Sequence, residues 1–171
     1  ISGAALYSAI QESKVTAAIT EFSEAIKALE AYYLDVGDIL PNYASGTEFF
    51  DATYLVDDNS LTGWKGPYLP FEKTITTTYR LINPTLGELM YINALDSSSW
   101  GEGGDSWATY NCPGGGDNCY IWVLFLGPKD IGFIKSLDQK YDGSVDAQNG
   151  KFRYYQSGGV YRIALKAIPH N

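Results

Sequence analysis

The sequence predicts an α+β protein in which one long N-terminal α-helix packs on an antiparallel sheet of four or five strands. Two observations predict this arrangement. Apolar residues recur at steps of four and three over the first 37 residues, whereas the segments after residue 70 are rich in β-branched and aromatic residues separated by turn residues. With 171 residues, the chain is long enough for a single domain with a sizeable core.

The helical spine is predicted over residues 1–37. Alanines beside the apolar stripe favour helix, Gly37 supplies a left-handed cap, and Pro41 lies just beyond it as a stop. We expect the part of the stripe nearest Gly37 to lie under the sheet. The residues assigned to this helix-to-sheet packing are Phe22, Ile26, Leu29 and Tyr33. Toward residue 1, Leu6 and Ile10 are expected to stay exposed on an isolated head.

The globular head is predicted over residues 38–171. It begins with a long connection to residue 70, with helical turns near residues 49–50. A Gly-, Ser- and Asp-rich loop covers residues 96–118. The expected strands are residues 74–82, 88–95, 120–126, 152–156 and 160–165, the last two flanking Gly158 and Gly159 as a hairpin.

Composition and charge exclude several classes of function. The formal net charge is −8, which argues against binding of nucleic acid and against electrostatic adhesion to anionic lipid. The longest apolar run, residues 120–126, is too short to span a bilayer. The chain opens on Ile1 without an initiator Met, so we expect a processed or truncated product.

Cys112 and Cys119 enclose the residues Pro-Gly-Gly-Gly-Asp-Asn, and this flexible run lets the two sulfurs meet. A disulfide is the preferred interpretation, and it implies an oxidising compartment. Two free thiols are the alternative. A zinc site is a less favoured interpretation, because no second Cys or His pair accompanies the two cysteines.

The sequence offers few combinations of residues that are typical of catalysis, and the chain is not expected to be an enzyme. His170 is the single imidazole, and its place next to the C-terminal residue predicts a solvated tail. The glycine runs at residues 101–104 and 114–116 lack the following Lys-Ser/Thr of a phosphate loop. The adjacent acids Asp57 and Asp58 are typical of a turn.

Four segments resemble type IV pilins and the pseudopilins of type II secretion. The segment YYLDVG at residues 32–37 resembles the end of the pilin N-terminal helix, and GWKGPYL at residues 63–69 is similar to a segment of the major pseudopilins. LDQKYDG at residues 137–143 and GKFRY at residues 150–154 resemble the acidic turn and following strand of bacterial pilins. The Asp-Pro-Trp-Gly signature of major pseudopilins is absent, and residues 74–79 stand in its place, which favours a pilus over a secretion system.

The resemblance implies a pilin-like fold and a structural subunit of a type IV pilus or related filament, polymerising through its N-terminal helix and exposing its head. The implied partners are identical or homologous pilin subunits and the assembly machinery of the inner membrane. Contact with the membrane would be made only through a hydrophobic half-helix with a methylated N-terminus, which we expect to precede Ile1. The implied location is the inner membrane before assembly, then a cell-surface or periplasmic filament.

Other interpretations stay open at this point. A pseudopilin of a type II secretion system is one, and a secreted carbohydrate-binding or hydrolytic domain using Trp100, Trp107 and Tyr110 as stacking rings is another. No cofactor is expected, and calcium is the one alternative considered. Asp138, Asp142 and Asp146 recur every four residues, and their carboxylates suit Ca²⁺, a metal known for the major pseudopilins. A plain acidic turn is the alternative.

Overall fold

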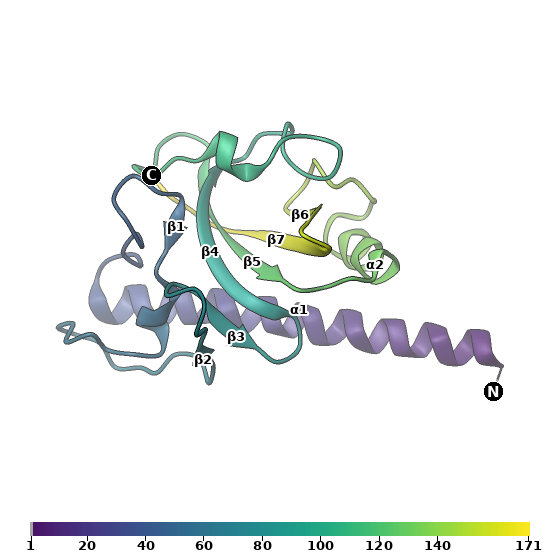
Figure 1. Cartoon of the computed structure of the whole chain (residues 1–171), viewed down its shortest axis with the longest axis horizontal. Helices are drawn as coiled ribbons and strands as arrows, with labels where there is room; N and C mark the ends of the chain where they lie inside the picture. The colour runs from purple at the N-terminus through teal and green to yellow at the C-terminus, as the bar shows by residue number, and fades with distance from the viewer. Residues whose placement is uncertain (1) are drawn as a thin grey trace.

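The computed structural model describes residues 2–171 and shows one sheet with a long helix lying along it (Figure 1). Ile1, which belongs to the predicted helical range, lies outside the described residues. The helices are α1 (Gly3–Val36) and α2 (Ile131–Asp142), with the short 3-10 helices η1 (Ala52–Leu55) and η2 (Trp107–Tyr110). The strands are β1 (Phe49–Phe50), β2 (Glu72–Lys73), β3 (Leu81–Asn83), β4 (Gly87–Leu95), β5 (Cys119–Leu126), β6 (Phe152–Ser157) and β7 (Val160–Pro169).

All strand pairs are antiparallel, and together they form one seven-stranded sheet. Its order is β2-β3-β4-β5-β7-β6, and β1 also pairs with β4. Strands β4, β5 and β7 are the long central ones, with Tyr91 opposite Val123 and Val123 opposite Leu165. The hairpin between β6 and β7 turns at Gly158 and Gly159, both at positive φ, as the sequence predicted.

This sheet overturns the predicted architecture of a helix on four or five strands, because it has seven. Strands β1 and β2 have two residues each, too few to show an alternating pattern, and β1 stands where helical turns were expected. The single strand predicted over residues 74–82 is also wrong. The Thr74 N–H donates to the Arg80 carbonyl (3.1 Å), so the chain turns there and leaves the short strands β2 and β3 on either side.

The sequence analysis also missed α2, which contacts both α1 and β6. Residues 137–143, which cover its second half and its C-cap, were assigned to an acidic turn. The Asp130 side chain caps its first turn by accepting from the N–H groups of Gly132 and Phe133 (2.9 and 3.3 Å), and Gly143 ends it at positive φ. Phe133, Ile134 and Leu137 fill the core. Both caps, and the spacing of the apolar residues of α2, can be recognised in the sequence.

The face of α1 that lies on the sheet differs from the predicted one. Its buried residues are Val15, Ala18, Phe22, Ala25, Ala28, Leu29 and Tyr32. Phe22 and Leu29 are buried as expected, but Ile26 is only half-buried and Tyr33 is 50% exposed. The larger side chains flank the contact because alanine at its centre lets the helix backbone approach the strands closely.

This close approach produces a hydrogen bond between helix and sheet. The buried Tyr91 hydroxyl of β4 donates to the Ala25 carbonyl at 2.8 Å, and the Phe22 ring meets the Phe125 ring of β5 edge-on at 4.9 Å. Burial raises the pKa of Tyr91 far above its usual range, which keeps the hydroxyl protonated as a donor. The helix is therefore held to the sheet by packing and by a directional contact.

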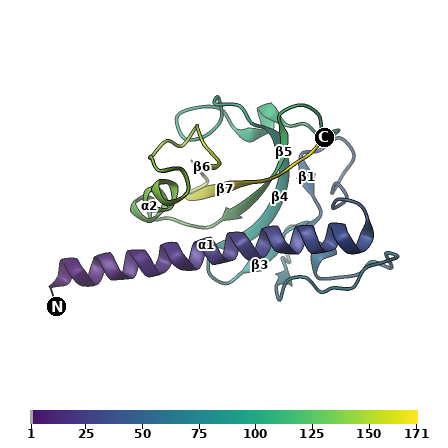
Figure 2. The same ribbon diagram turned by 180° about the vertical axis from the view of Figure 1, so that it is seen from behind.

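The opposite face of the sheet is covered by the loop between β4 and β5, which carries η2 (Figure 2). Met90, Ile92, Trp122 and Leu124 point into this second core, where Trp100 and Trp107 of the loop close it. Within residues 2–171, no helix is long and apolar enough to cross a membrane.

Replacement of Phe22 and of Tyr33 by alanine tests this helix orientation. Phe22→Ala removes a fully buried ring and is expected to lower the free energy of unfolding by about 3–5 kcal/mol, whereas Tyr33→Ala should cost about 1 kcal/mol because its ring is half in solvent. Urea denaturation of both variants measures the difference. Equal losses of unfolding free energy in the two variants would support the helix orientation predicted from the sequence, in which Tyr33 is buried.

Candidate functional site

The N-terminal part of α1 extends beyond the sheet and lies apart from the head (Figure 1). Residues 2–10 are all exposed, and the first buried residue of the helix is Val15. Three large apolar side chains lie on this extension, with exposed fractions of 55% for Leu6, 60% for Tyr7 and 45% for Ile10. Ile10 follows Tyr7 by three residues and Leu6 by four, which places the three side chains on one side of the helix. We call residues 2–10 the extension.

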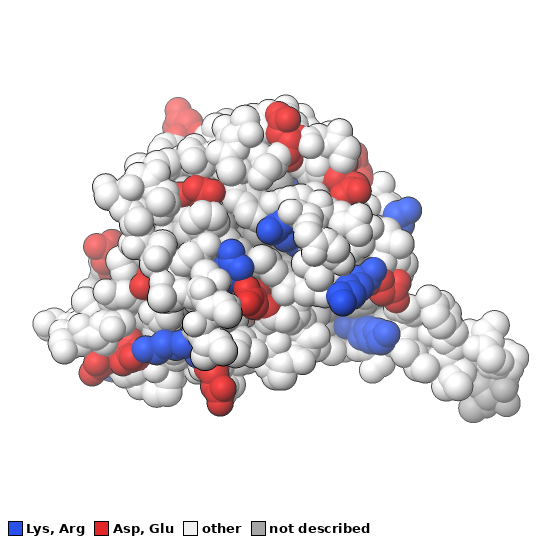
Figure 3. All heavy atoms as spheres, viewed as in Figure 1, with Lys and Arg blue, Asp and Glu red and all other residues white. Residues whose placement is uncertain are grey.

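The extension carries no charge, in contrast with the rest of the surface. The first charged residue of the chain is Glu12, although the chain has 20 acidic and 12 basic residues. Figure 3 shows the extended end of the molecule without charged side chains on the face drawn. An uncharged helix segment with exposed Leu, Tyr and Ile is typical of a surface that another protein covers.

The base of the extension is fixed to the head through α2. The Gln11 amide donates to the Tyr7 hydroxyl and to the Asp130 carboxylate, both at 2.9 Å. This hydrogen bond holds the pKa of Asp130 below its usual range, as do the N–H groups that Asp130 caps. The carboxylate is thus kept ionised where it joins the two helices.

Two grooves flank α1 where it leaves the head. One, of about 430 Å³, lies beside Ala17, Leu86 and Phe133, and the other, of about 570 Å³, lies between α1 and α2 beside Val15 and Ser136. The first groove is partly apolar, whereas the second is lined mostly by polar residues of α1 and α2.

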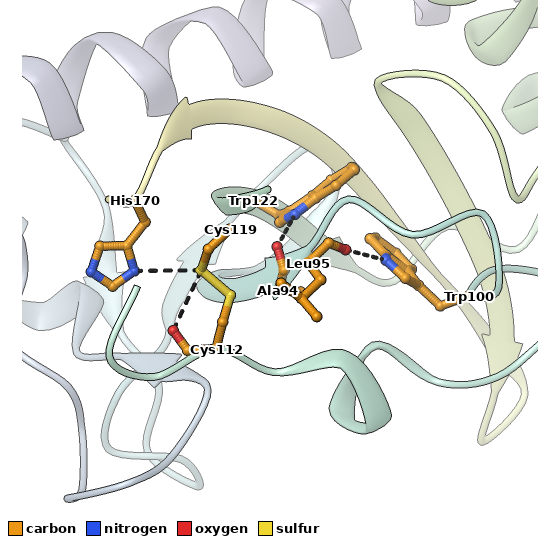
Figure 4. Close-up of a disulfide and its surroundings, with 7 residues drawn as sticks. All are labelled: Ala94, Leu95, Trp100, Cys112, Cys119, Trp122 and His170. Carbon is orange, nitrogen blue, oxygen red and sulfur yellow. Dashed lines mark hydrogen bonds between the residues drawn. A yellow bond between two sulfur atoms is a disulfide. The ribbon is translucent and has the colours of Figure 1, made fainter. Parts of the chain in front are cut away.

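The predicted disulfide is present between Cys112 and Cys119 (Figure 4). Its ring holds the end of β7, because the Gly116 N–H donates to the His170 carbonyl (2.8 Å) and the His170 N–H donates to the Cys119 carbonyl (2.9 Å). His170 is consequently not the solvated tail that was expected. Its ring lies 5.7 Å from the Phe50 ring, and burial lowers its pKa.

Trp100 and Trp107 do not form the exposed stacking surface that a carbohydrate-binding domain would need, because both are buried. The Trp100 ring packs edge-on against Trp122 at 4.6 Å, and its indole N–H donates to the Leu95 carbonyl at 3.0 Å (Figure 4). The third candidate, Tyr110, is half-buried.

A buried arginine, Arg153, lies against two of the inward-facing tryptophans. The Arg153 guanidinium lies 4.5 Å from the Trp100 ring centre and 5.0 Å from that of Trp122, and it pairs with Asp96 at 2.6 Å. Such a cation between two rings stabilises the loop on the sheet. Sequence reasoning missed this cluster, since Arg153 lies 31 residues beyond Trp122.

The three aspartates considered for calcium each serve the neighbouring backbone. Asp138 accepts from the Asp146 N–H (2.8 Å), Asp142 accepts from the Phe152 N–H (2.9 Å), and Asp146 accepts from the Gln148 N–H (3.1 Å). In the part of the chain that the structure describes, no group of three or more His, Cys, Asp or Glu is placed to hold a metal ion.

Asp138 is fully buried, and this burial raises its pKa to about 6, helped by the nearby Asp142 and Asp146. Its Oδ1 has no hydrogen-bond partner among residues 2–171. The folded state therefore binds a proton at Asp138 more tightly than the unfolded state does.

The Asp138→Asn variant tests this linkage. The wild-type free energy of unfolding should fall relative to that of the variant as pH rises from about 4, the pKa of unfolded Asp, through the folded value of about 6. The stability difference between the two proteins, followed by urea denaturation against pH, should then level off. A difference independent of pH would show that Asp138 titrates normally.

The double variant Cys112→Ser/Cys119→Ser tests the disulfide. On the loop-entropy model, loss of this small ring should lower the free energy of unfolding by about 2–3 kcal/mol. Loss of the disulfide should increase the mobility of the loop that carries it more than it destabilises the sheet, because the ring is local. Thiol labelling of the denatured, non-reduced wild-type chain should find no free thiol, and two labelled thiols would contradict the assignment.

Comparison of the chain with protein-family models, with curated proteins and with solved structures finds no match. The comparisons therefore assign the chain to no family.

Proposed function

We propose that the chain is a structural subunit of a type IV pilus or related filament and that it assembles through the extension. The observation that carries this proposal is the uncharged end of α1, which presents Leu6, Tyr7 and Ile10 to solvent. Burial of each such side chain contributes about 1.5–3 kcal/mol. A structure that holds three of them on a rigid helix, clear of its own core, is suited to a contact with another subunit.

The composition of the extension suits packing between helices. Gly3, Ala4, Ala5 and Ala9 lie among the three large side chains. Small residues allow helix axes to approach, while the larger ones fill the grooves of the neighbouring helix. Because the extension has no charge, bundled copies would bury no unpaired ion. We therefore propose further copies of this chain, or homologous subunits, as the partners of the extension.

Two of the segments that resemble pilins pack against each other, which supports treating them as one feature. The Asp35 carboxylate of the first segment accepts from Lys65 Nζ (3.0 Å) and from the Tyr68 hydroxyl (3.1 Å) of the second. Gly63 allows this approach, because a Cβ there would lie 2.5 Å from the Asp35 carbonyl oxygen. The hydrogen bond from Lys65 holds the pKa of Asp35 below its usual range.

In this proposal the head faces outward on the filament, and the machinery of the inner membrane assembles the subunits. A pseudopilin of a type II secretion system would use the same surface, and the similarity of residues 63–69 to major pseudopilins favours it as the second candidate. The two differ in their products: a pilus reaches the cell surface, whereas a pseudopilus serves the export of other proteins.

The variant Ile10→Glu tests the assembly surface. Because Ile10 makes no core contact, the head should fold with an unchanged melting temperature, but the buried charge should prevent subunits from packing. In the cells that make the protein, electron microscopy should show no filaments at equal protein level. If surface filaments are absent from the wild type, retention of secreted proteins in the variant becomes the readout for the pseudopilin.

Leu34→Glu is the matched control, since Leu34 is an 81% exposed apolar residue of the same helix outside the extension. This variant should keep filaments or secretion. Normal assembly of Ile10→Glu would contradict the proposal. Equal loss in both variants would also contradict it, because the effect would then follow any charge added to α1.

A further inference from the structure

The first of the two grooves that flank α1, of about 430 Å³, is enclosed by three parts of the chain. They are α1 itself, the turn between β3 and β4, and the connection that leads from β5 into α2. Volumes of this size are typical of small-ligand pockets. The function proposed above makes no use of this groove.

The floor of the groove is apolar. Leu86 and Phe133 line it and are almost completely buried in the main core, so they form a fixed surface. Ala17 and Pro128 complete the apolar lining and are more accessible to solvent. An alkyl chain seated here would remove this apolar surface from water.

Two lysines line the groove from different elements. Lys14 belongs to α1 and Lys129 to the connection before α2, and both side chains are exposed. In the part of the chain that the structure describes, neither forms an ion pair. Figure 3 shows Lys or Arg side chains beside the point where the extended end leaves the head. Positive charge is therefore available to a ligand in the groove.

The carboxylates at the groove are already bonded to neutral donors. Asp130 lines the groove and accepts from the Gln11 amide and from two N–H groups in the first turn of α2 (2.9, 2.9 and 3.3 Å). Glu21 accepts from the Asn83 amide (2.6 Å) and from the hydroxyl of Thr85, which also lines the groove (3.2 Å). These hydrogen bonds leave the two lysines without a fixed partner.

We propose that this groove binds an anionic amphiphile, a molecule with a phosphate or carboxylate head and an alkyl chain. The head would pair with Lys14 and Lys129, and the chain would lie on Leu86 and Phe133. A cationic amphiphile would meet the two lysines, and a neutral one would give up charge-assisted hydrogen bonds to them. An inorganic anion would leave the apolar floor in water.

The net charge of −8 does not oppose such a local contact. At physiological ionic strength the Debye length is about 8 Å, so acidic residues on the far side of the head are screened from a ligand in the groove. The contact needs neither filaments nor a second copy of the chain. The proposal is thus independent of the function proposed above.

Titration of the full chain with n-octyl phosphate near neutral pH, followed by ¹⁵N NMR, tests the site. Backbone amides of residues 13–17, 85–86 and 129–133 should shift in a saturable way. The neutral n-octanol and the headless anion, inorganic phosphate, should each bind at least about tenfold more weakly, because each lacks one of the two contacts. Octyltrimethylammonium should not bind. Equal affinity for n-octyl phosphate and n-octanol, or no binding of n-octyl phosphate, would overturn the proposal.

Matched double variants separate the site from general effects of charge. Lys14→Gln/Lys129→Gln should weaken n-octyl phosphate at least about tenfold. Its melting temperature should stay unchanged, because neither lysine has an ion-pair partner to lose among the described residues. Lys135→Gln/Lys140→Gln removes two exposed lysines of α2 that do not line this groove, and it should bind as the wild type does. Unchanged affinity in the first variant, or an equal loss in both, would overturn the proposal.

Vesicles distinguish two sources of the same chemistry. Vesicles of phosphatidylglycerol present phosphate groups at a bilayer surface, whereas n-octyl phosphate represents a free amphiphile. Sedimentation of the chain with these vesicles that is lost in Lys14→Gln/Lys129→Gln would assign the groove to a phospholipid. Binding of n-octyl phosphate without such lysine-dependent sedimentation would assign it to a free amphiphile. Binding of neither would contradict the proposal.

Discussion

The close contact between α1 and the sheet determines most of the other features of the molecule. Ala18, Ala25 and Ala28 bring the helix backbone near the strands, so the Tyr91 hydroxyl reaches the Ala25 carbonyl and Phe22 reaches Phe125. Larger residues at these alanine positions would move the helix away and break the hydrogen bond. Because the first buried residue of α1 is Val15, everything before it is left outside the core.

This arrangement gives one helix two roles. From Val15 onward α1 is part of the core, while the extension is a rigid continuation without tertiary support of its own. Such a stretch would be marginally helical in isolation, but here it is the end of a 34-residue helix whose nucleus is already formed. The proposed assembly surface is therefore ordered before a partner arrives, which lowers the entropic cost of association.

The sequence predicted the features that depend on local patterns. The helix that ends at Gly37, the strands at β4 and β5, the β6–β7 hairpin and the disulfide all follow from periodicity, turn residues or a short cysteine ring. The strand number and the orientation of Tyr33 could not be predicted in the same way. Strands of two residues carry no pattern of their own and form only through hydrogen bonds to a neighbouring strand, and an alanine face signals close packing only once its partner is known.

Features of the sites that depend on distant residues were also beyond the sequence. His170 is half-buried because β7 pairs with β5 as far as Pro169, which places the His170 ring beside Phe50. The inward turn of Trp100 depends on Arg153 from β6. Neither contact joins neighbours in sequence. By contrast, α2 was predictable from its caps and apolar spacing, and the acidic residues of its last turn were given too much weight.

Hydrogen–deuterium exchange along α1, in the isolated chain and in assembled filaments, tests most directly whether one helix serves both core and assembly. In the isolated chain, amides from Val15 to Tyr32 should be the most strongly protected, and those of the extension should be less protected, because no tertiary contact adds to the stability of its helical hydrogen bonds. In filaments, the extension should become protected while the rest of α1 changes little. Equal exchange of the extension in both states would show that subunits do not meet there, and protection of the isolated extension equal to that of Val15 to Tyr32 would show that it already has a partner within the chain.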